Sequence, residues 1–143
     1  MTHLTPHARL VLVVALAANT ANLLDLRPGR VGKVALLVGV LMTLAGGPGS
    51  RLAGVATGSA AGLLPADLAE RTMLGDTGAN ALGALLGLAI VTGASRRRVY
   101  AVLGLLAGLT AASEVVSFSA VIDRNQPLRH LDRLGRQADQ PDV

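Results

Sequence analysis

Ala81-Leu-Gly-Ala-Leu-Leu-Gly-Leu-Ala-Ile-Val91 is an unbroken apolar stretch that carries no charge at any helical position. Residues Val34–Thr43 are likewise free of charge. A helix that is apolar all round lies either deep in a protein core or in a membrane. A chain of 143 residues cannot bury several such helices at once. The alternative, a soluble bundle of core helices, is therefore disfavoured.

The composition agrees with a membrane protein. Hydrophobic residues make up 51% of the chain and charged residues only 15%, against about 25% charged in ordinary soluble domains. The apolar residues fall into five blocks, which are Leu10–Leu24, Val31–Ala45, Leu52–Leu64, Ala79–Val91 and Val99–Val121. A spanning helix needs about 20 residues, so only the last block is long enough without its flanking Gly, Ser and Thr. We predict an all-α fold, a membrane bundle of about five transmembrane helices over residues 1–121, followed by a basic cytoplasmic tail at 122–143.

Charge and cysteine content limit the kinds of partner and metal site that the chain can have. The chain has no cysteine, which excludes disulfides and thiolate metal sites. Its formal net charge is +4, but aromatic residues are only 1% and the arginines lie beside apolar blocks. Few side chains are therefore available to stack on bases, and anionic lipid headgroups are a better partner than nucleic acid. The N-terminus carries little positive charge before its apolar run and does not resemble a cleaved signal peptide.

Five spans would bring the joints after the first, third and fifth blocks to one face. Eight of the 13 basic residues fall on that face, which are Arg27, Arg30, Lys33, Arg71, Arg124, Arg129, Arg133 and Arg136. The other five are Arg9, Arg51, Arg96, Arg97 and Arg98. The majority favours a cytoplasmic location for the first face, although the run Arg96–Arg98 opposes it. Both acidic motifs described below then lie on the cytoplasmic side of the plasma membrane.

Glycines recur at four-residue spacing in three blocks. The longest repeat is Gly54-x3-Gly58-x3-Gly62, and shorter ones occur at Gly83/Gly87 and at Gly104/Gly108. In lipid, such spacing allows helix backbones to approach closely. A glycine-rich composition also produces isolated pairs by chance, so the triple repeat is the strongest candidate for a helix interface.

Asn19, Asn22 and Asp25 recur at every third position at the end of the first block. On a helix, this spacing places two amides and one carboxylate along one broad stripe. A carboxylate at the edge of hydrocarbon is costly and typically marks a pathway, a paired site or a metal site. The alternative is that Asp25 pairs with Arg27 or Arg30 while the asparagines hydrogen-bond a neighbouring helix.

Asp76 lies in the segment Gly75-Asp-Thr-Gly-Ala-Asn80, just before the fourth block. The flanking glycines allow a phosphate to approach the backbone, and the dipole of a helix N-terminus favours it. A hard cation such as Mg²⁺ binds carboxylate and phosphate oxygens together. The alternative is that Asp76 or Thr77 simply caps the helix.

Together, these two segments resemble motifs of the polyprenyl-phosphate N-acetylhexosamine-1-phosphate transferases, a superfamily that includes phospho-N-acetylmuramoyl-pentapeptide transferase (glycosyltransferase family 4). Residues 19–25 (Asn-Thr-Ala-Asn-Leu-Leu-Asp), followed by Gly29, are similar to its Asn-x-x-Asn-x-x-Asp-Gly-x-x-Gly motif. Residues 74–83 (Leu-Gly-Asp-Thr-Gly-Ala-Asn-Ala-Leu-Gly) are similar to its Gly-Asp-x-Gly-Ser-x-x-Leu-Gly motif. The order of the motifs, their separation by one helical hairpin and their shared face agree with the family.

The resemblance implies transfer of a sugar-1-phosphate from a UDP-sugar to polyprenyl phosphate, with Mg²⁺, in the biogenesis of cell-wall glycans such as peptidoglycan. It implies Asp25 and Asp76 as catalytic residues, with Asp76 as the metal ligand. Asn19, Asn22 and Asn80 would bind the nucleotide-sugar. Phosphoryl transfer depends on positioning and on neutralising charge more than on covalent help from the protein, which suits these residue types.

The last part of the chain adds further candidates. The family has a histidine- and arginine-containing loop near the substrate phosphates, which implies Arg129 and His130 as substrate-binding residues. The alternative is a basic amphipathic segment that lies on anionic lipid. Glu114 is also a functional candidate, because it falls inside the longest apolar block. It could equally hydrogen-bond another helix or face a polar groove.

The chain also departs from the family pattern. Leu26 and Pro28 stand where the family has a glycine and often an acid, and no acidic residue precedes Asp25. The family's earlier Asp-Asp pair therefore has no counterpart, and the resemblance covers only the C-terminal half of a family member. We expect little activity from the chain alone, as a fragment, a truncated product or a half that needs a homodimer mate or another partner. The alternative function is a non-catalytic membrane assembly or lipid-interaction subunit that retains the fold.

Overall fold

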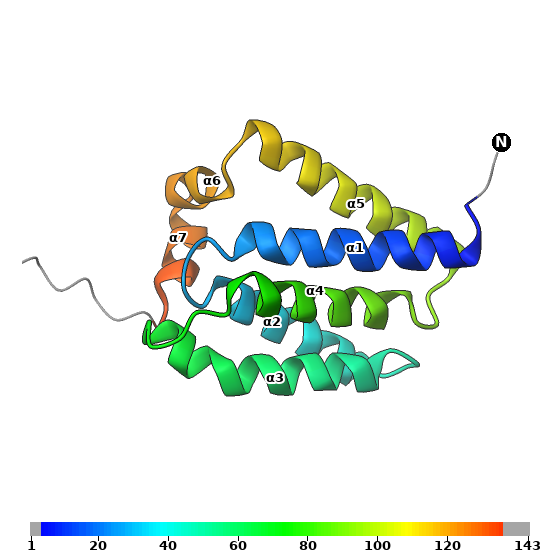
Figure 1. Ribbon diagram of the computed structural model, residues 1–143, viewed down its shortest axis with the longest axis horizontal. Coiled ribbons are helices and arrows are strands. Elements are labelled where there is room, and N and C mark those ends of the chain that lie inside the picture. The colour runs from blue at the N-terminus through cyan, green and yellow to red at the C-terminus, as the bar shows by residue number, and fades with distance from the viewer. Residues whose placement is uncertain (1–3, 136–143) are drawn as a thin grey trace, which may run out of the picture.

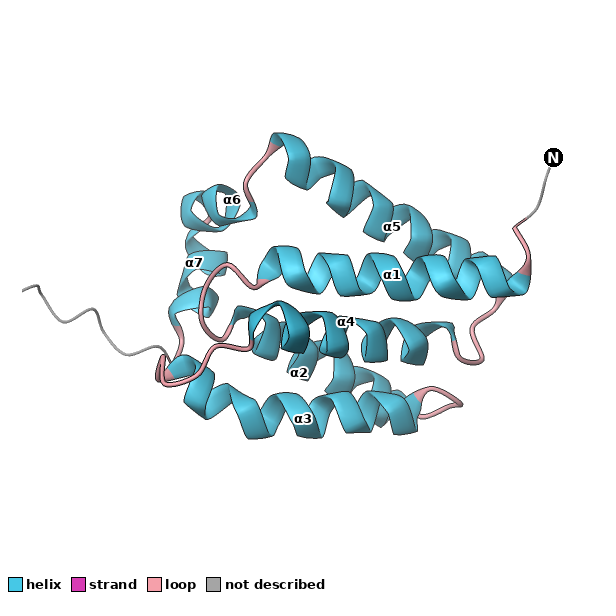
Figure 2. Ribbon diagram, viewed as in Figure 1, coloured by secondary structure: helices cyan, strands magenta, loops and turns pink. Residues whose placement is uncertain are grey.

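Seven helices and no strand make up residues 4–135, the part of the chain that the computed structural model describes (Figure 2). The helices are α1 (Pro6–Leu24), α2 (Arg30–Ala45), α3 (Ser50–Leu68), α4 (Gly75–Val91), α5 (Arg96–Val115), α6 (Phe118–Arg124) and α7 (Gln126–Arg133). The prediction of an all-helical fold is confirmed. Each of the five apolar blocks lies largely within one of the first five helices.

Local chemistry explains where the first two helices begin. The Thr5 hydroxyl accepts a hydrogen bond from the backbone N–H of Ala8 at 3.2 Å, and Pro6 occupies the first turn, where its missing N–H costs nothing. α2 begins after Gly29, which has a φ of 75°. Glycine adopts this left-handed conformation without strain, so the chain reverses direction within a short loop between Leu24 and Arg30.

The last apolar block does not form one helix. Val99–Val121 was the block predicted to span without help, but α5 ends at Val115 and α6 begins at Phe118. Val116 is extended, with φ −129° and ψ 123°. The run Val115-Val-Ser117 contains two β-branched residues and a serine, all poorer helix formers than Ala or Leu. This run is the physical reason that the helix stops before the end of the apolar block.

The first five helices lie roughly side by side as a bundle (Figure 1). α1 packs against α4 and α5, while α3 packs against α2 and α4. One core cluster lies among α2, α3 and α4 and is built mostly from small residues, with Val31, Ala35, Ala56, Ala60, Ala79, Leu82 and Leu86 as its buried members. A smaller cluster of Val13, Val99 and Leu103 joins α1 to α5. Small core residues let the helix axes approach closely.

Among the described residues, only one of the three glycine repeats is used in close packing. A Cβ atom at Gly83 would lie 2.5 Å from the carbonyl oxygen of Ala17, so α4 and α1 are in backbone contact there. No atom lies within 4 Å of a Cβ built at Gly58 or Gly62. In the α3 repeat, the strongest sequence candidate for an interface, Gly58 and Gly62 are therefore open, while a Cβ at Gly54 would only touch Thr43 of α2 at 3.8 Å.

The joints separate into two ends, as the sequence predicted. The α1–α2 loop, the α3–α4 loop and helices α6 and α7 lie at one end, which is on the left of Figure 1. The α2–α3 and α4–α5 loops lie at the other end, near the start of α1. We call the first of these the acidic-motif end, because Asp25 and Asp76 both lie there.

Two of the described helices, α1 and α5, are long and apolar enough to cross a membrane by length and composition. α4 is apolar but shorter, with 17 residues, and α2 has 16. Five spanning helices therefore stay a prediction that needs flanking residues to complete the shorter spans.

Candidate functional site

The two acidic motifs meet at the acidic-motif end of the bundle. Asp25 caps the C-terminus of α1, where its backbone N–H donates to the carbonyl oxygen of Asn22 at 3.1 Å. Its carboxylate accepts a hydrogen bond from the backbone N–H of Gly75, the first residue of α4. Partial burial, and then repulsion from Asp67 and Asp76, raises the pKa of Asp25 above its ordinary value, while the Gly75 bond opposes this rise. Asp25 and Asp76 are therefore close enough to feel each other's charge.

Asp76 does not cap α4. The residue before the helix is Leu74, and no side chain makes a capping hydrogen bond there. Asp76 lies exposed in the first turn, with Asn80 exposed one turn later on the same face. The alternative of a capping role for Asp76 is wrong, and its carboxylate is open to solvent beside Asp25.

Asp67 is a third carboxylate at this end, and the sequence analysis missed it. Its side chain is 4% exposed and accepts a hydrogen bond from the backbone N–H of Gly29 at 2.9 Å. It thereby fixes the α1–α2 loop that follows Asp25. The sequence indicated Asp67 only as an acid shortly after an apolar block and two residues after Pro65. Its hydrogen-bond partner, Gly29, lies 38 residues away.

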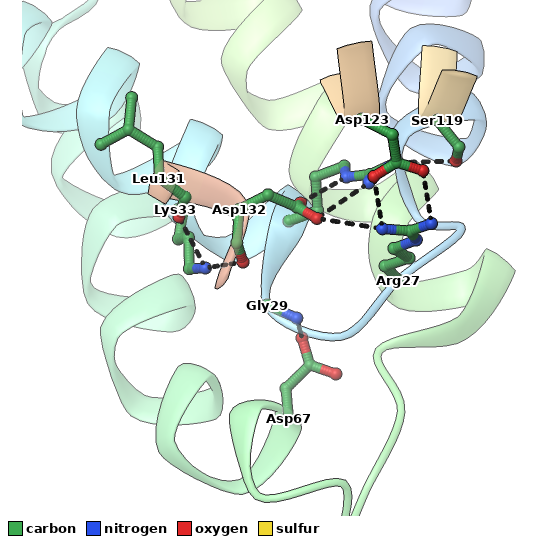
Figure 3. A network of polar contacts seen from close by, with 9 residues as sticks. Arg27, Gly29, Lys33, Asp67, Ser119, Asp123, Leu131 and Asp132 are labelled. Atoms are coloured by element: carbon green, nitrogen blue, oxygen red, sulfur yellow. Dashed lines mark hydrogen bonds and ion pairs between the residues drawn. The ribbon is translucent and has the colours of Figure 1, made fainter. Parts of the chain in front are cut away.

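Arg27 and Arg30 do not pair with Asp25, so that alternative is wrong. Figure 3 shows Arg27 turned toward Asp123 of α6. Arg27 binds Asp123 through two hydrogen bonds, Nη1 to Oδ1 at 3.0 Å and Nη2 to Oδ2 at 2.8 Å. Its Nη1 also lies 3.6 Å from an oxygen of Asp132. The arginines nearest in sequence to Asp25 therefore leave its charge uncompensated.

Arg30 and Asp132 form a buried ion pair, with both side chains only 4% exposed. The guanidinium donates from Nε to Oδ1 at 2.8 Å and from Nη2 to Oδ2 at 3.1 Å, and its Nη1 donates to Ser119 Oγ at 3.2 Å. Such a bidentate pair is both strong and directional. The hydrogen bonds from Arg30 hold the pKa of Asp132 below its ordinary value. We call this pair, the Arg27–Asp123 pair and their hydrogen-bond partners the arm clamp, because they hold α6 and α7 against the start of α2.

Lys33 completes the arm clamp at the C-terminal end of α7. Its ammonium donates to the backbone carbonyl oxygens of Leu131 at 3.1 Å and of Asp132 at 2.6 Å (Figure 3). A cation near a helix C-terminus satisfies free carbonyls and complements the helix dipole. The segment after α5 is thus fastened to the start of α2 along its described length.

The three asparagines lie in different settings. Asn19 donates from Nδ2 to the Thr110 hydroxyl of α5 at 3.2 Å, which is the helix-to-helix bond considered as an alternative. The Oδ1 atom of Asn22 is buried and has no hydrogen-bond partner among the described residues. Asn80 is exposed beside Asp76. Asn19 is therefore engaged in the contact between α1 and α5, while the amide oxygen of Asn22 has no partner among the described residues.

Arg129 and His130 lie on α7, apart from the hydrogen bonds of the arm clamp. Arg129 is half-buried and His130 is exposed, and both line a surface pocket together with Gln126 and Arg133. No described hydrogen bond or ion pair joins them to Asp25 or Asp76. Glu114 is exposed on the last part of α5 and has no described hydrogen bond to another helix.

Oxygen atoms of the kind that Mg²⁺ prefers lie at the acidic-motif end. Asp25 and Asp76 supply carboxylates, and Asn22 supplies a buried amide oxygen without a partner among residues 4–135. Within those residues, no group of three or more acidic or histidine side chains is arranged to hold a metal alone. Mg²⁺ usually takes one or two protein carboxylates and completes its shell with water and substrate phosphate. The residues fit a cation shared with a phosphate and do not form an all-protein cage.

Comparison with protein-family models, with curated proteins and with solved structures finds no match to this chain. Inferences about its function rest on the residues and geometry described above.

Proposed function

We propose that the chain is a multi-pass membrane protein whose acidic-motif end is half of a site for sugar-1-phosphate transfer from a UDP-sugar to polyprenyl phosphate. The observation that carries the proposal is the electrostatic contact of Asp25 with Asp76 across the α1 and α4 helix ends. These are the two acids that the family resemblance singles out. Neither acid has an ion pair within residues 4–135, and this arrangement at the boundary of an apolar bundle suits a site for a cation and phosphate.

The exposed apolar surface supports embedding in a membrane. Large hydrophobic side chains remain exposed along the flanks of the bundle, including Val11, Leu37, Leu41, Leu44, Val55, Leu63 and Leu105, each between 48% and 79% exposed. Exposed large hydrophobic side chains on four helices are expected for a surface that faces lipid. We propose about five spans, with α2, α3 and α4 completed by flanking residues.

A groove between α1 and α4 supports a lipid substrate. Its volume is about 510 Å³ and its lining is almost wholly apolar, with Leu10, Val11, Val14, Ala15, Ala18, Ala81, Ala84, Leu85 and Leu88 along it. It begins at Ala18, one turn before Asn22, and at Ala81, next to Asn80, and it extends along both helices to Leu10 and Leu88. An isoprenoid chain lying there would present its phosphate toward Asp25 and Asp76.

The chain's own residues would bind and position the reactants. Asp76 and Asp25 would hold Mg²⁺, which when bound neutralises phosphate charge and orients the reacting groups. Asn22 and Asn80 would orient the nucleotide-sugar through their amides. The exposed turn of α4 leaves a phosphate free to approach from solvent.

One observation favours the alternative of a non-catalytic or lipid-interaction subunit. Arg27 and Arg30, the cations nearest to Asp25, are engaged in ion pairs with Asp123 and Asp132 and are not free to bind phosphate. On this alternative, the bundle keeps the fold and binds lipid without turnover.

The test uses the protein in proteoliposomes, both alone and in membranes of its source. Asp25→Asn and Asp76→Asn should abolish Mg²⁺-dependent UMP release in the complete assembly and weaken binding of UDP-N-acetylglucosamine with Mg²⁺. Glu70→Gln, which also removes an acid from the α3–α4 loop, is the control and should change neither. Unchanged turnover and binding in both aspartate variants would contradict the assignment. Turnover absent from every assembly that contains wild-type chain would favour the subunit.

A further inference from the structure

The two short helices that follow α5 turn their acids inward. We call α6 and α7, with Leu134 after them, the C-terminal arm. Asp123 and Asp132 are its acidic residues, and both face the bundle in ion pairs with Arg27 and Arg30. Because the Asp132 side chain is 4% exposed and bound in two places, it fixes the rotation of α7 about its own axis. The arm therefore has a defined outer surface.

That outer surface is basic and apolar. Arg124, Arg129 and Arg133 have no acidic partner within residues 4–135. Leu128, Leu131 and Leu134 are 42%, 57% and 49% exposed. Their i, i+3 spacing puts the leucines along one flank of α7, and the i, i+4 spacing puts Arg129 and Arg133 along the other. Leucines and arginines are thus segregated on either side of the buried Asp132.

We propose that this outer surface of the C-terminal arm docks on anionic lipid headgroups. An amphipathic helix with arginines on its polar side and leucines on the other lies in the headgroup region, where each side meets the environment it prefers. Basic residues near an anionic leaflet are attracted to it, and salt weakens this attraction. The arm lies at the acidic-motif end, as does the α1–α2 loop to which it is clamped (Figure 1).

Charge selects this occupant over two others. A second copy of the chain would bring the same unpaired arginines against each other, and the chain as a whole has a net charge of +4. A free phosphate would be bound by the arginines but would leave three exposed leucines without a role. An anionic bilayer accounts for both flanks.

The proposal rests on the membrane embedding argued above, and its test separates the two. Because the chain lacks cysteine, Leu131→Cys can carry a single environment-sensitive fluorophore. The full chain is reconstituted in vesicles of phosphatidylcholine alone or with phosphatidylglycerol, and carbonate-resistant integration is measured first. Met73→Cys, which is 71% exposed in the α3–α4 loop at the same end, carries the control fluorophore.

The expected result is quenching of the Leu131 probe by spin-labelled lipid that increases with phosphatidylglycerol, while the Met73 probe does not change. Arg129→Gln and Arg133→Gln each remove one positive charge. Each should lower the ratio of lipid-docked to undocked arm, reported by the Leu131 probe, by about fivefold. Added salt should lower it too, whereas inorganic phosphate at equal ionic strength should do no more than chloride. The docking proposal alone would be overturned if the protein integrates but quenching of the Leu131 probe does not depend on phosphatidylglycerol. It would also be overturned if inorganic phosphate lowers the quenching more than chloride does. If the protein does not integrate, the membrane embedding on which the proposed function and the docking proposal rest would be overturned.

Discussion

At the end of α1, the Asp25 carboxylate lies where its charge is disfavoured. It is partly desolvated and repelled by Asp67 and Asp76, so its pKa is raised. The native state therefore binds a proton more readily than the unfolded chain, and this carboxylate costs stability increasingly as the pH rises from about 3.8 through the raised pKa. A residue kept at a cost to stability is typical of a functional site.

Asp25→Asn should consequently stabilise the protein at neutral pH. The amide oxygen can still accept from Gly75, while the repulsion from Asp67 and Asp76 is removed. We expect the midpoint of thermal unfolding in detergent to rise by roughly 2 °C at pH 7, with the gain disappearing near pH 4. Circular dichroism at both pH values measures it. A variant less stable than wild type at pH 7 would show that Asp25 is a structural residue.

The sequence revealed the acids of the site but not their surroundings. Asp25 and Asp76 were recognisable because each lies beside amides or glycines at the end of an apolar block. Asp67 and Asp132 were missed because their partners are 38 and 102 residues away, and local spacing carries no information about such pairs. For the same reason, the sequence suggested Arg27 and Arg30 as partners of Asp25, since their true partners are 96 and 102 residues away.

Among the helices, the contact between α1 and α4 depends on the absence of side chains. A Cβ at Gly83 would meet backbone atoms of Ala17 and Ala18 within 2.8 Å, so Gly83→Ala should force the helices apart. We expect a loss of about 1–3 kcal/mol in the free energy of unfolding. Gly58→Ala is the matched control, since it meets nothing within 4 Å and should gain about 0.5–1 kcal/mol from helix propensity. Thermal unfolding ranks the two, and equal effects would argue against this packing.

If Gly58→Ala instead destabilises the protein, a partner covers α3. The open repeat would then be the contact of the predicted homodimer. Cross-linking of the reconstituted wild type and variant distinguishes this case from a fault in the packing of α1 on α4.

The arm clamp makes α7 an extension of the bundle. Asp132→Asn should leave Arg30 buried without its counter-charge and cost about 3 kcal/mol. Replacing both partners with apolar residues, Arg30→Met with Asp132→Leu, should recover most of that loss. The pKa of Asp132 is lowered, so its contribution is complete above its ordinary value of 3.8 and is lost as the pH falls through the lowered pKa. Limited proteolysis between residues 125 and 135 measures release of α7, and an unchanged pattern in Asp132→Asn would contradict the clamp.

The helices themselves were predicted better than their ends. The five apolar blocks identified α1 to α5, because a long run of apolar residues marks a whole element. The ends were wrong where polar residues continue a helix, as at Ser50 and Arg96, and where Val116 breaks one without a glycine or proline. Helix caps and breaks depend on a few local dihedral angles, and composition does not report them.

For the whole molecule, the central claim is that both acidic motifs lie on one side of a membrane that the bundle crosses several times. The absence of native cysteine makes single-cysteine labelling clean. Leu26→Cys, beside Asp25, and Met73→Cys, beside Asp76, are 62% and 71% exposed. Ser95→Cys lies exposed at the opposite end of the bundle.

Labelling of intact cells with a membrane-impermeant maleimide is the most direct test. The expected result is that Ser95→Cys is labelled in intact cells, while Leu26→Cys and Met73→Cys are labelled only after lysis, with all three proteins in the carbonate-resistant membrane fraction. Labelling of Leu26→Cys and Met73→Cys from opposite sides, or recovery of the chain in the soluble fraction, would contradict the account.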